Sequence, residues 1–204
     1  MAEDGALCVL RAADRRTEAW KNGGGVTREI AACPEGAGTD DFAWRVSLAD
    51  VAAGGPFSAF PGVDRTLTLV EGAGMDLTVG GVHRRVAERY APQDFAGDEP
   101  TDCLLVDGPV RNVNVMYRRG VVRARTAVVR GGLDLTAAPG ETLLLVALAG
   151  TAVFEPSEPS DACASSESSA GAAVRLDPYD AVLATGALTG LVRTSGHVAV
   201  VRFA

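Results

Sequence analysis

Histidine and paired cysteine are scarce in this sequence of 204 residues. Only two histidines occur, His83 beside a glycine pair and His197 before the last apolar run. The four cysteines are far apart and form no C-x-x-C pair. A metal site needs several histidine, cysteine or carboxylate ligands at suitable spacing. We therefore expect no metal and no other cofactor, and isolated thiols suit a reducing compartment.

A long apolar run and a basic leader are also missing. The longest apolar run, Leu143 to Ala149, has the length of a strand and falls short of the roughly 20 residues that span a bilayer. The first residues, Met1 to Asp4, are acidic where a secretory signal would be basic. These features favour a cytoplasmic protein without a membrane partner.

Clustered positive charge is absent as well. The formal net charge is −7. The densest basic group lies between Arg111 and Arg125, and alternation within Val121–Val129 favours a place for these arginines on the solvent side of strands. A surface for nucleic acid needs clustered lysine and arginine against the phosphates. We expect no nucleic-acid partner, and leave a homodimer open.

Short β-branched runs fill the chain instead, broken at close intervals by glycine, proline and aspartate. Helical periodicity is hard to find, and many short strands with frequent turns predict a barrel or a sandwich. The expected strands are Ala6–Leu10, Val26–Ala31, Phe42–Leu48, Thr66–Val70, Met75–Val79, Cys103–Val106, Val113–Tyr117, Val121–Val129, Leu143–Val146, Ala152–Phe154, Ala181–Leu183 and Val198–Phe203.

Two parts of the chain resemble each other. Residues 67–74 match residues 143–150, which aligns Leu67 with Leu143, and a proline followed two residues later by aspartate recurs at Asp94 and Asp180. The second copy is longer than the first. This weak repeat indicates two similar barrels.

The extra residues of the second copy fall in the segment 155–170, which is rich in serine, glutamate and proline. This composition is typical of a disordered loop, because it buries too little apolar surface to offset the entropy of ordering. From the repeat we expect two barrels, at residues 1–118 and 119–204, in one integrated unit. The insertion lies in the second barrel.

The segment Trp20–Glu29 (WKNGGGVTRE) is the least ordinary part of the chain. Three consecutive glycines suggest tight backbone geometry or close approach of a ligand, and no nucleotide-binding glycine motif is present. One interpretation is a simple turn. The other is a loop facing a ligand, in which Trp20, Lys21 and Asn22 supply stacking, charge and an amide beside Gly24.

Alternation assigns polar side chains to common strand faces. Arg45 and Ser47 share one face of their strand, and Asn114 and Met116 share one face of another. Such faces meet bulk water or line the mouth of a barrel. Arg65 follows a rigid loop with two prolines and Phe60, and it forms either a structural pair with its neighbouring aspartate or a carboxylate-binding fork.

Four blocks of sequence resemble the HutD/Ves family. They are Trp20–Ile30 (WKNGGGVTREI), Trp44–Asp50 (WRVSLAD), Gly55–Met75 (GPFSAFPGVDRTLTLVEGAGM) and Asp107–Met116 (DGPVRNVNVM). The resemblance implies an all-β bicupin fold of two jelly-roll barrels packed together. It also implies a bacterial protein associated with histidine utilisation, proposed to bind a pathway metabolite and moderate the pathway, with no established catalytic reaction.

Metal-dependent cupins carry an H-x-H motif, and the equivalent run Asp64–Gly72 has no histidine. We therefore expect a metal-free protein that binds a small anionic metabolite, such as a urocanate- or formylglutamate-like acid. The expected ligand-binding residues are Trp20, Lys21, Asn22, Gly24, Arg45, Ser47, Phe60, Arg65, Asn114 and Met116, and no catalytic residue is assigned.

Two alternatives stay open. The first is a cofactor-independent enzyme that acts on a small polar acid, with Glu71 or Asp64 as the acid or base and Lys21 as an electrostatic stabiliser. The second is an interaction protein in which the binding site is vestigial and the insertion 155–170 recruits the partner.

Overall fold

The computed structural model describes residues 6–20, 22–157, 161–162 and 172–204. The chain divides into a middle unit, residues 15–123, and a terminal unit, residues 1–14 with 124–204. This differs from the expected division after residue 118, because strand β1 (Ala6–Leu10) pairs with β17 (Ala181–Thr185) and so adds the start of the chain to the terminal unit.

Strands make up nearly all regular structure in the described ranges, and the one helical segment there is the 3-10 turn η1 (Ala12–Asp14). The expected all-β class is therefore confirmed. No helix in these ranges is both long and apolar enough to cross a membrane.

The middle unit consists of two antiparallel sheets. One has six strands in the order β2-β3-β4-β11-β6-β9, and the other has four in the order β5-β10-β7-β8. The bounds are β2 Glu18–Ala19, β3 Gly25–Cys33, β4 Trp44–Val51, β5 Gly55–Pro56, β6 Val63–Glu71, β7 Met75–Val79, β8 Val82–Val86, β9 Pro92–Ala96, β10 Thr101–Leu105 and β11 Val110–Arg118.

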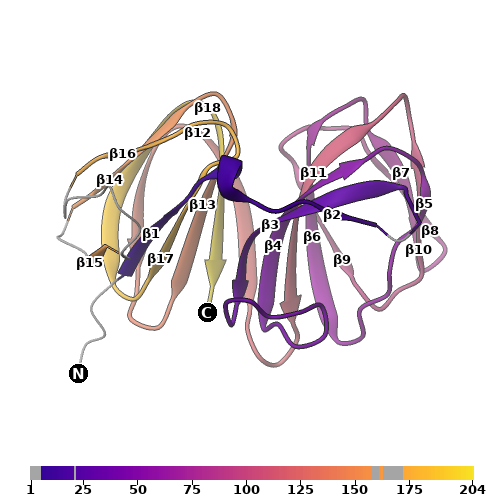
Figure 1. The fold of residues 1–204 in the computed structure, drawn as a ribbon, viewed down its shortest axis with the longest axis horizontal. Coiled ribbons are helices and arrows are strands. Elements are labelled where there is room, and N and C mark those ends of the chain that lie inside the picture. Colours follow the sequence, from indigo (N-terminus) through magenta and orange to yellow (C-terminus); the bar gives the residue numbers. More distant parts are fainter. Residues whose placement is uncertain (1–5, 21, 158–160, 163–171) are drawn as a thin grey trace. The chain divides into compact units, whose positions relative to one another are not determined.

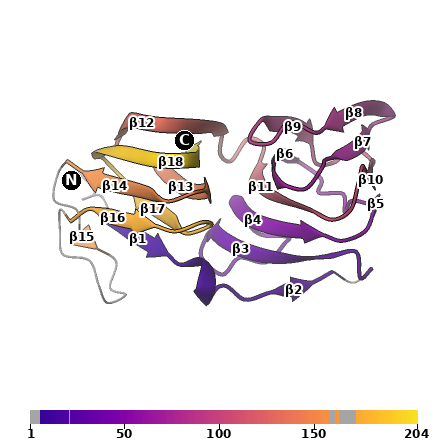
Figure 2. The same ribbon diagram turned by 90° about the horizontal axis from the view of Figure 1, so that it is seen from above.

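Apolar side chains of both sheets form the core of the middle unit. Leu67 and Leu69 of β6 pack in one cluster with Met75 and Leu77 of β7 and with Cys103 of β10. In both views the four-stranded sheet lies at one side of the unit (Figures 1 and 2). The strand face that contains Leu67 and Leu69 is therefore the interior face of the six-stranded sheet.

The terminal unit is one eight-stranded sheet in the order β15-β1-β17-β13-β18-β14-β16, with β12 paired to β18. The long strand β18 pairs with β13 through its second half and with β14 through its first half, so the sheet folds over a single apolar core. The further bounds are β12 Ala124–Ala137, β13 Thr142–Ala149, β14 Ala152–Pro156, β15 Asp161–Ala162, β16 Val174–Leu176 and β18 Leu188–Phe203.

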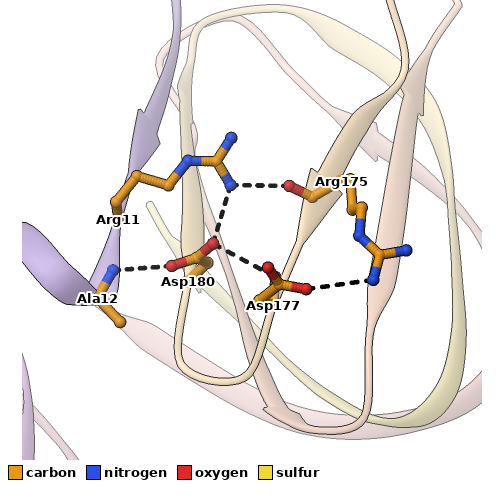
Figure 3. A network of polar contacts seen from close by, with 5 residues as sticks. All are labelled: Arg11, Ala12, Arg175, Asp177 and Asp180. Atoms are coloured by element: carbon orange, nitrogen blue, oxygen red, sulfur yellow. Dashed lines mark hydrogen bonds and ion pairs between the residues drawn. The ribbon is translucent and has the colours of Figure 1, made fainter.

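A buried aspartate attaches the first strand to the rest of the terminal unit (Figure 3). The Asp180 carboxylate accepts hydrogen bonds from the Ala12 N–H at 2.7 Å and from Arg11 Nη1 at 2.8 Å. The same Arg11 nitrogen donates to the Arg175 carbonyl at 2.8 Å. These bonds satisfy the backbone where the chain leaves β1 for η1.

The predicted repeat is present, with a different alignment. Tyr90 and Tyr179 both have a positive φ, 66° and 70°, and both donate a backbone N–H to a strand carbonyl, of Leu69 and Ala147 respectively. This geometry aligns Leu67 with Leu145, two residues beyond the alignment from sequence. Apolar strand residues match equally well at either position, so the sequence alone did not fix the alignment.

The segment 155–170, predicted to be a disordered loop, is described only in part. Glu155 and Pro156 continue strand β14, which corrects the prediction for these two residues. Asp161–Ala162 form β15, parallel to β1. Residues 158–160 and 163–171 lie outside the described residues.

Candidate functional site

Three neighbouring strands of the middle unit bring the predicted polar residues to one face. Arg45 of β4 and Arg65 of β6 are both paired with Met116 of the central strand β11, in the strand order visible in Figure 1. Their Cα atoms are therefore about 10 Å apart, at about 4.8 Å per strand spacing. Phe95 of β9 extends this row beyond Arg65.

The next row along the strands contains Ser47 and Asn114, which pair with each other, and Leu67 beside Asn114. Because Leu67 belongs to the core between the sheets, the polar row shares the interior face. Ser47 and Asn114 are both buried. The sequence left open whether this polar face meets bulk water or lines the barrel, and the register places it inside.

The Arg65 guanidinium lies among three aromatic rings and one amide. Its central carbon is 5.1 Å from the ring centroids of Phe57 and Phe95 and 5.8 Å from that of Phe60. Nε and Nη2 donate to Asn114 Oδ1 at 3.3 and 3.2 Å. Cation–π attraction and a neutral oxygen therefore stabilise the charge.

Arg65 is buried and lacks a carboxylate partner in the part of the chain that the structure describes. It is 8% exposed, and none of the ion pairs among the described residues involves it. Burial lowers the pKa of Arg65 to about 10, so the side chain stays positive at neutral pH. A buried cation that meets only neutral groups is well placed to receive an anion.

Arg45, by contrast, is already neutralised. Its Nε donates to Glu29 Oε2 of β3 at 2.6 Å, and its Nη2 is 3.5 Å from Glu18 Oε2 of β2. We expected Arg45, like Arg65, to be a ligand-binding residue. The structure instead gives it two carboxylates of the chain, so the two arginines differ in what they can bind.

The glycine-rich segment lies at the other end of the same sheet. Gly25 pairs with Val51, which is six residues beyond Arg45 on β4, a separation of about 20 Å. Trp20, Asn22 and Gly24 were predicted to bind the ligand together with Arg65, and the strand register separates their hairpin from Arg65 along the sheet.

Local contacts explain this segment as a hairpin turn. The Trp20 indole donates to the Thr27 hydroxyl at 2.8 Å, and Asn22 Oδ1 accepts from the Gly24 N–H at 3.0 Å. A Cβ on Gly25 would clash with the carbonyl oxygen of Asp50 and lie 3.2 Å from the Trp20 ring. Contacts within the hairpin therefore explain the presence of Gly25 and Trp20 without a ligand. Lys21 lies outside the described residues.

The carboxylates considered for acid–base chemistry do not converge on Arg65. Asp64 precedes Arg65 on β6 and so faces the opposite side of the sheet, where Arg119 Nε is 3.5 Å away. Glu71 ends the strand and pairs with Arg111 Nη1 at 2.9 Å. Asp64 therefore lies on the other face of the sheet from the Arg65 guanidinium, and Glu71 lies at the other end of β6.

Three side chains near the site were not predicted from the sequence. Phe57 comes from the same proline-rich loop as Phe60, and the paired aromatics of that loop were a usable signal. Phe95 and Glu29 reach the site only through the pairing of β9 with β6 and of β3 with β4. Long-range pairing of this kind leaves no local sequence signal.

The aligned positions of the terminal unit are apolar. The Tyr90–Tyr179 alignment and the strand registers place Leu143 where the middle unit has Arg65, Val200 where it has Asn114, and Ala184 where it has Phe95. All three are buried in the core of the terminal unit. The buried polar row is thus a property of the middle unit.

The histidines lie away from this row. His83 Nε2 is 3.7 Å from Asp76 Oδ1 at the exposed strand β8, and His197 belongs to β18. Within the described ranges no three histidine, cysteine, aspartate or glutamate side chains are grouped so that they could hold a metal ion.

Comparison with known proteins identifies relatives over most of the chain. The HutD family model matches residues 12–200. An uncharacterised 21.2 kDa protein from the hutC 3′ region of Pseudomonas putida is 38% identical over 141 residues, 69% of this chain and 74% of that protein. Protein Ves of Cronobacter sakazakii is 41% identical over 110 residues, 53% of this chain and 59% of Ves.

Solved structures agree with this assignment. A conserved protein of unknown function from Pseudomonas aeruginosa PAO1 superposes with a TM-score of 0.83 at 33% identity, covering 97% of this chain and 98% of that one. HutD from Pseudomonas fluorescens SBW25, solved in a formate condition, gives a TM-score of 0.80 at 31% identity, covering 97% of both chains.

The fold class follows from a more distant similarity. A cupin barrel protein from Leptotrichia buccalis superposes with a TM-score of 0.53 at 9% identity, covering 92% of this chain and 90% of that one, which shows the fold alone. The expected cupin-type fold is confirmed. The family model spans nearly all of the sequence, and the chain belongs to the HutD family.

Proposed function

We propose that the chain is a binding protein that captures a small carboxylate at Arg65. The observation that carries this proposal is the buried guanidinium, framed by three phenylalanine rings and without a carboxylate partner among the described residues. The rings suit the apolar body of a ligand, and the fork-shaped guanidinium suits its carboxylate.

The energetics favour binding of an anion over a purely structural role. Removing a charge from water costs several kcal/mol in real proteins. Two hydrogen bonds to Asn114 Oδ1, both longer than 3.1 Å, and the cation–π contacts with the three rings offset only part of this cost. A ligand carboxylate would add charge-assisted hydrogen bonds of about 1.5–3 kcal/mol each.

The family relationship suggests which acids to try. The relative from Pseudomonas putida is a protein of the hutC 3′ region, and the HutD/Ves resemblance connects such proteins with histidine utilisation. A urocanate- or formylglutamate-like acid is small and anionic, as the Arg65 site requires. Capture of such a metabolite would let the protein moderate the pathway.

Isothermal titration calorimetry with urocanate and N-formylglutamate tests the proposal. We expect at least one of them to bind, and Arg65→Met to weaken that binding about 10- to 100-fold, the loss of one charge-assisted contact. Thermal unfolding of the variant shows whether the protein is still folded.

Arg118→Met is the matched control. Arg118 also lies over an aromatic ring, 5.7 Å from the Phe42 centroid, but it donates to the carbonyl oxygens of Phe42 and Asp40 at 3.3 and 2.8 Å. This substitution should leave the affinity unchanged. Equal affinity of folded Arg65→Met and wild type would overturn the proposal, as would the failure of both acids to bind.

A further inference from the structure

A second charged group lies on the same interior face as Arg65. Glu29 of β3 pairs with Ser47, and Ser47 pairs with Asn114, so all three lie in the row next to that of Arg65. The Cα atoms of Glu29 and Arg65 are separated by three strand spacings, about 14 Å across the sheet. Their side chains reach over the same face from opposite sides.

The two sides of this interior face, at β3–β4 and at β6–β9, differ in charge. Arg65 is a cation without a carboxylate partner in the described ranges, whereas Arg45 has Glu29 at 2.6 Å and Glu18 at 3.5 Å. Glu18 is 71% exposed and contributes little. The β3–β4 side is therefore neutral to negative, and the β6–β9 side is positive.

Glu29 keeps capacity to accept further hydrogen bonds. Its Oε2 accepts from Arg45, and within the described residues no hydrogen bond reaches its Oε1. An ionised carboxylate has about four lone-pair positions, and the Glu29 side chain is 34% exposed. A ligand donor is thus able to reach this oxygen.

We propose that the site is bipolar: it takes a small acid whose carboxylate binds Arg65 and whose other end is an ammonium or ring N–H group that donates to Glu29. This inference rests on the proposed function and specifies its ligand class. Ser47 and Asn114 supply hydrogen-bonding groups between the two ends, and Met116 supplies an apolar surface. Of the two acids named above, urocanate, with its ring N–H, belongs to this class, whereas a dicarboxylate such as N-formylglutamate would bring its second charge against Glu29 and is disfavoured.

Matched sets of simple acids test the ligand class. The sets are β-alanine, propionate and malonate; γ-aminobutyrate, butyrate and succinate; and δ-aminovalerate, valerate and glutarate. Each set varies only the group at the far end, and the three sets vary the length. We expect the amino acid of at least one set to bind about tenfold more tightly than its plain acid, and the diacid more weakly than the amino acid.

Glu29→Gln identifies the residue responsible. It keeps an oxygen for Arg45 but removes the negative charge, so it should reduce the preference for the amino acid over the plain acid about tenfold. Glu18→Gln is the control, since Glu18 touches the same arginine from an exposed position, and it should leave the preference unchanged.

The outcomes separate the two proposals. If none of these acids, and neither urocanate nor N-formylglutamate, binds in an Arg65-dependent way, capture of a carboxylate is itself overturned. If acids bind through Arg65 but show no preference for the amino end, or if Glu29→Gln retains the preference in full, only the bipolar site is overturned. A reduced preference in Glu29→Gln alone supports it.

Discussion

Arg65 and Asp180 are both buried, but different kinds of neighbouring group stabilise their charges. Arg65 faces aromatic rings and an amide oxygen. Asp180, 6% exposed, accepts hydrogen bonds from the Ala12 and Asp177 N–H groups and from Arg11 (Figure 3). A buried charge with an oppositely charged partner stabilises the fold. A buried charge that contacts only neutral groups can bind a ligand of opposite charge.

Asp180→Asn should destabilise the protein by about 1.5–3 kcal/mol at neutral pH, because it weakens charge-assisted bonds to Arg11 and Ala12. Burial raises the pKa of Asp180, but the bonds from Ala12 and Arg11 outweigh it and lower the pKa below its usual value. The ionised form therefore stabilises the fold above the usual aspartate pKa of about 4, and this stability is lost as the pH falls through the lowered value. Urea unfolding of wild type and variant from pH 7 to pH 3 should show their difference shrinking.

Asp177→Asn is the control for this measurement. Asp177 pairs with Arg175 at 3.3 Å, and both side chains are about two-thirds exposed. Its replacement should change the free energy of unfolding by no more than about 0.5 kcal/mol. A pH-independent difference for Asp180→Asn would contradict the electrostatic explanation.

At the scale of elements, substitutions at two glycines of the hairpin between β2 and β3 test which of these positions requires glycine. Gly25→Ala should destabilise the protein by about 1–3 kcal/mol, because the new methyl group meets the Asp50 carbonyl and the Trp20 ring. Gly23→Asn should cost less, since Gly23 has a φ of 70°, which asparagine tolerates, and no atom within 4 Å of the added Cβ. Chemical unfolding of both variants provides the comparison.

Neither hairpin substitution should alter binding at Arg65, because the turn lies about 20 Å away along β4. Loss of affinity in folded Gly25→Ala, without a matching loss in stability, would mean that the hairpin contributes to the ligand site after all.

Sequence alternation predicted which side chains share a face of each strand. It did not predict which parts of distant strands lie side by side in the sheet. Alternation placed Arg45 with Ser47 and Asn114 with Met116, and the pairing of β4 with β11 keeps these pairs on one face. The position of the glycine-rich turn, and the contact of Glu29 with Arg45, depend on pairing between distant strands. Alternation repeats every second residue, so it is compatible with several registers.

At the scale of the whole molecule, the two units share a strand arrangement but differ in the side chains of their interiors. The order β4-β11-β6-β9 of the middle unit corresponds to β12-β18-β13-β17 of the terminal unit. The family resemblance was carried mainly by blocks of the middle unit, which include Arg65 and Asn114. The apolar residues at the aligned positions fill the terminal core.

This difference predicts one ligand per chain and a cost in stability for having the site. Calorimetry should give a stoichiometry near one for any acid that binds through Arg65. The double variant Arg65→Leu with Asn114→Val installs the residues that the terminal unit has at these positions. It should abolish binding and leave the free energy of unfolding equal to or above that of the wild type, because it removes a buried charge together with its polar partner. A second site per chain, or a large loss of stability in the double variant, would show that the polar row serves the fold of the middle unit.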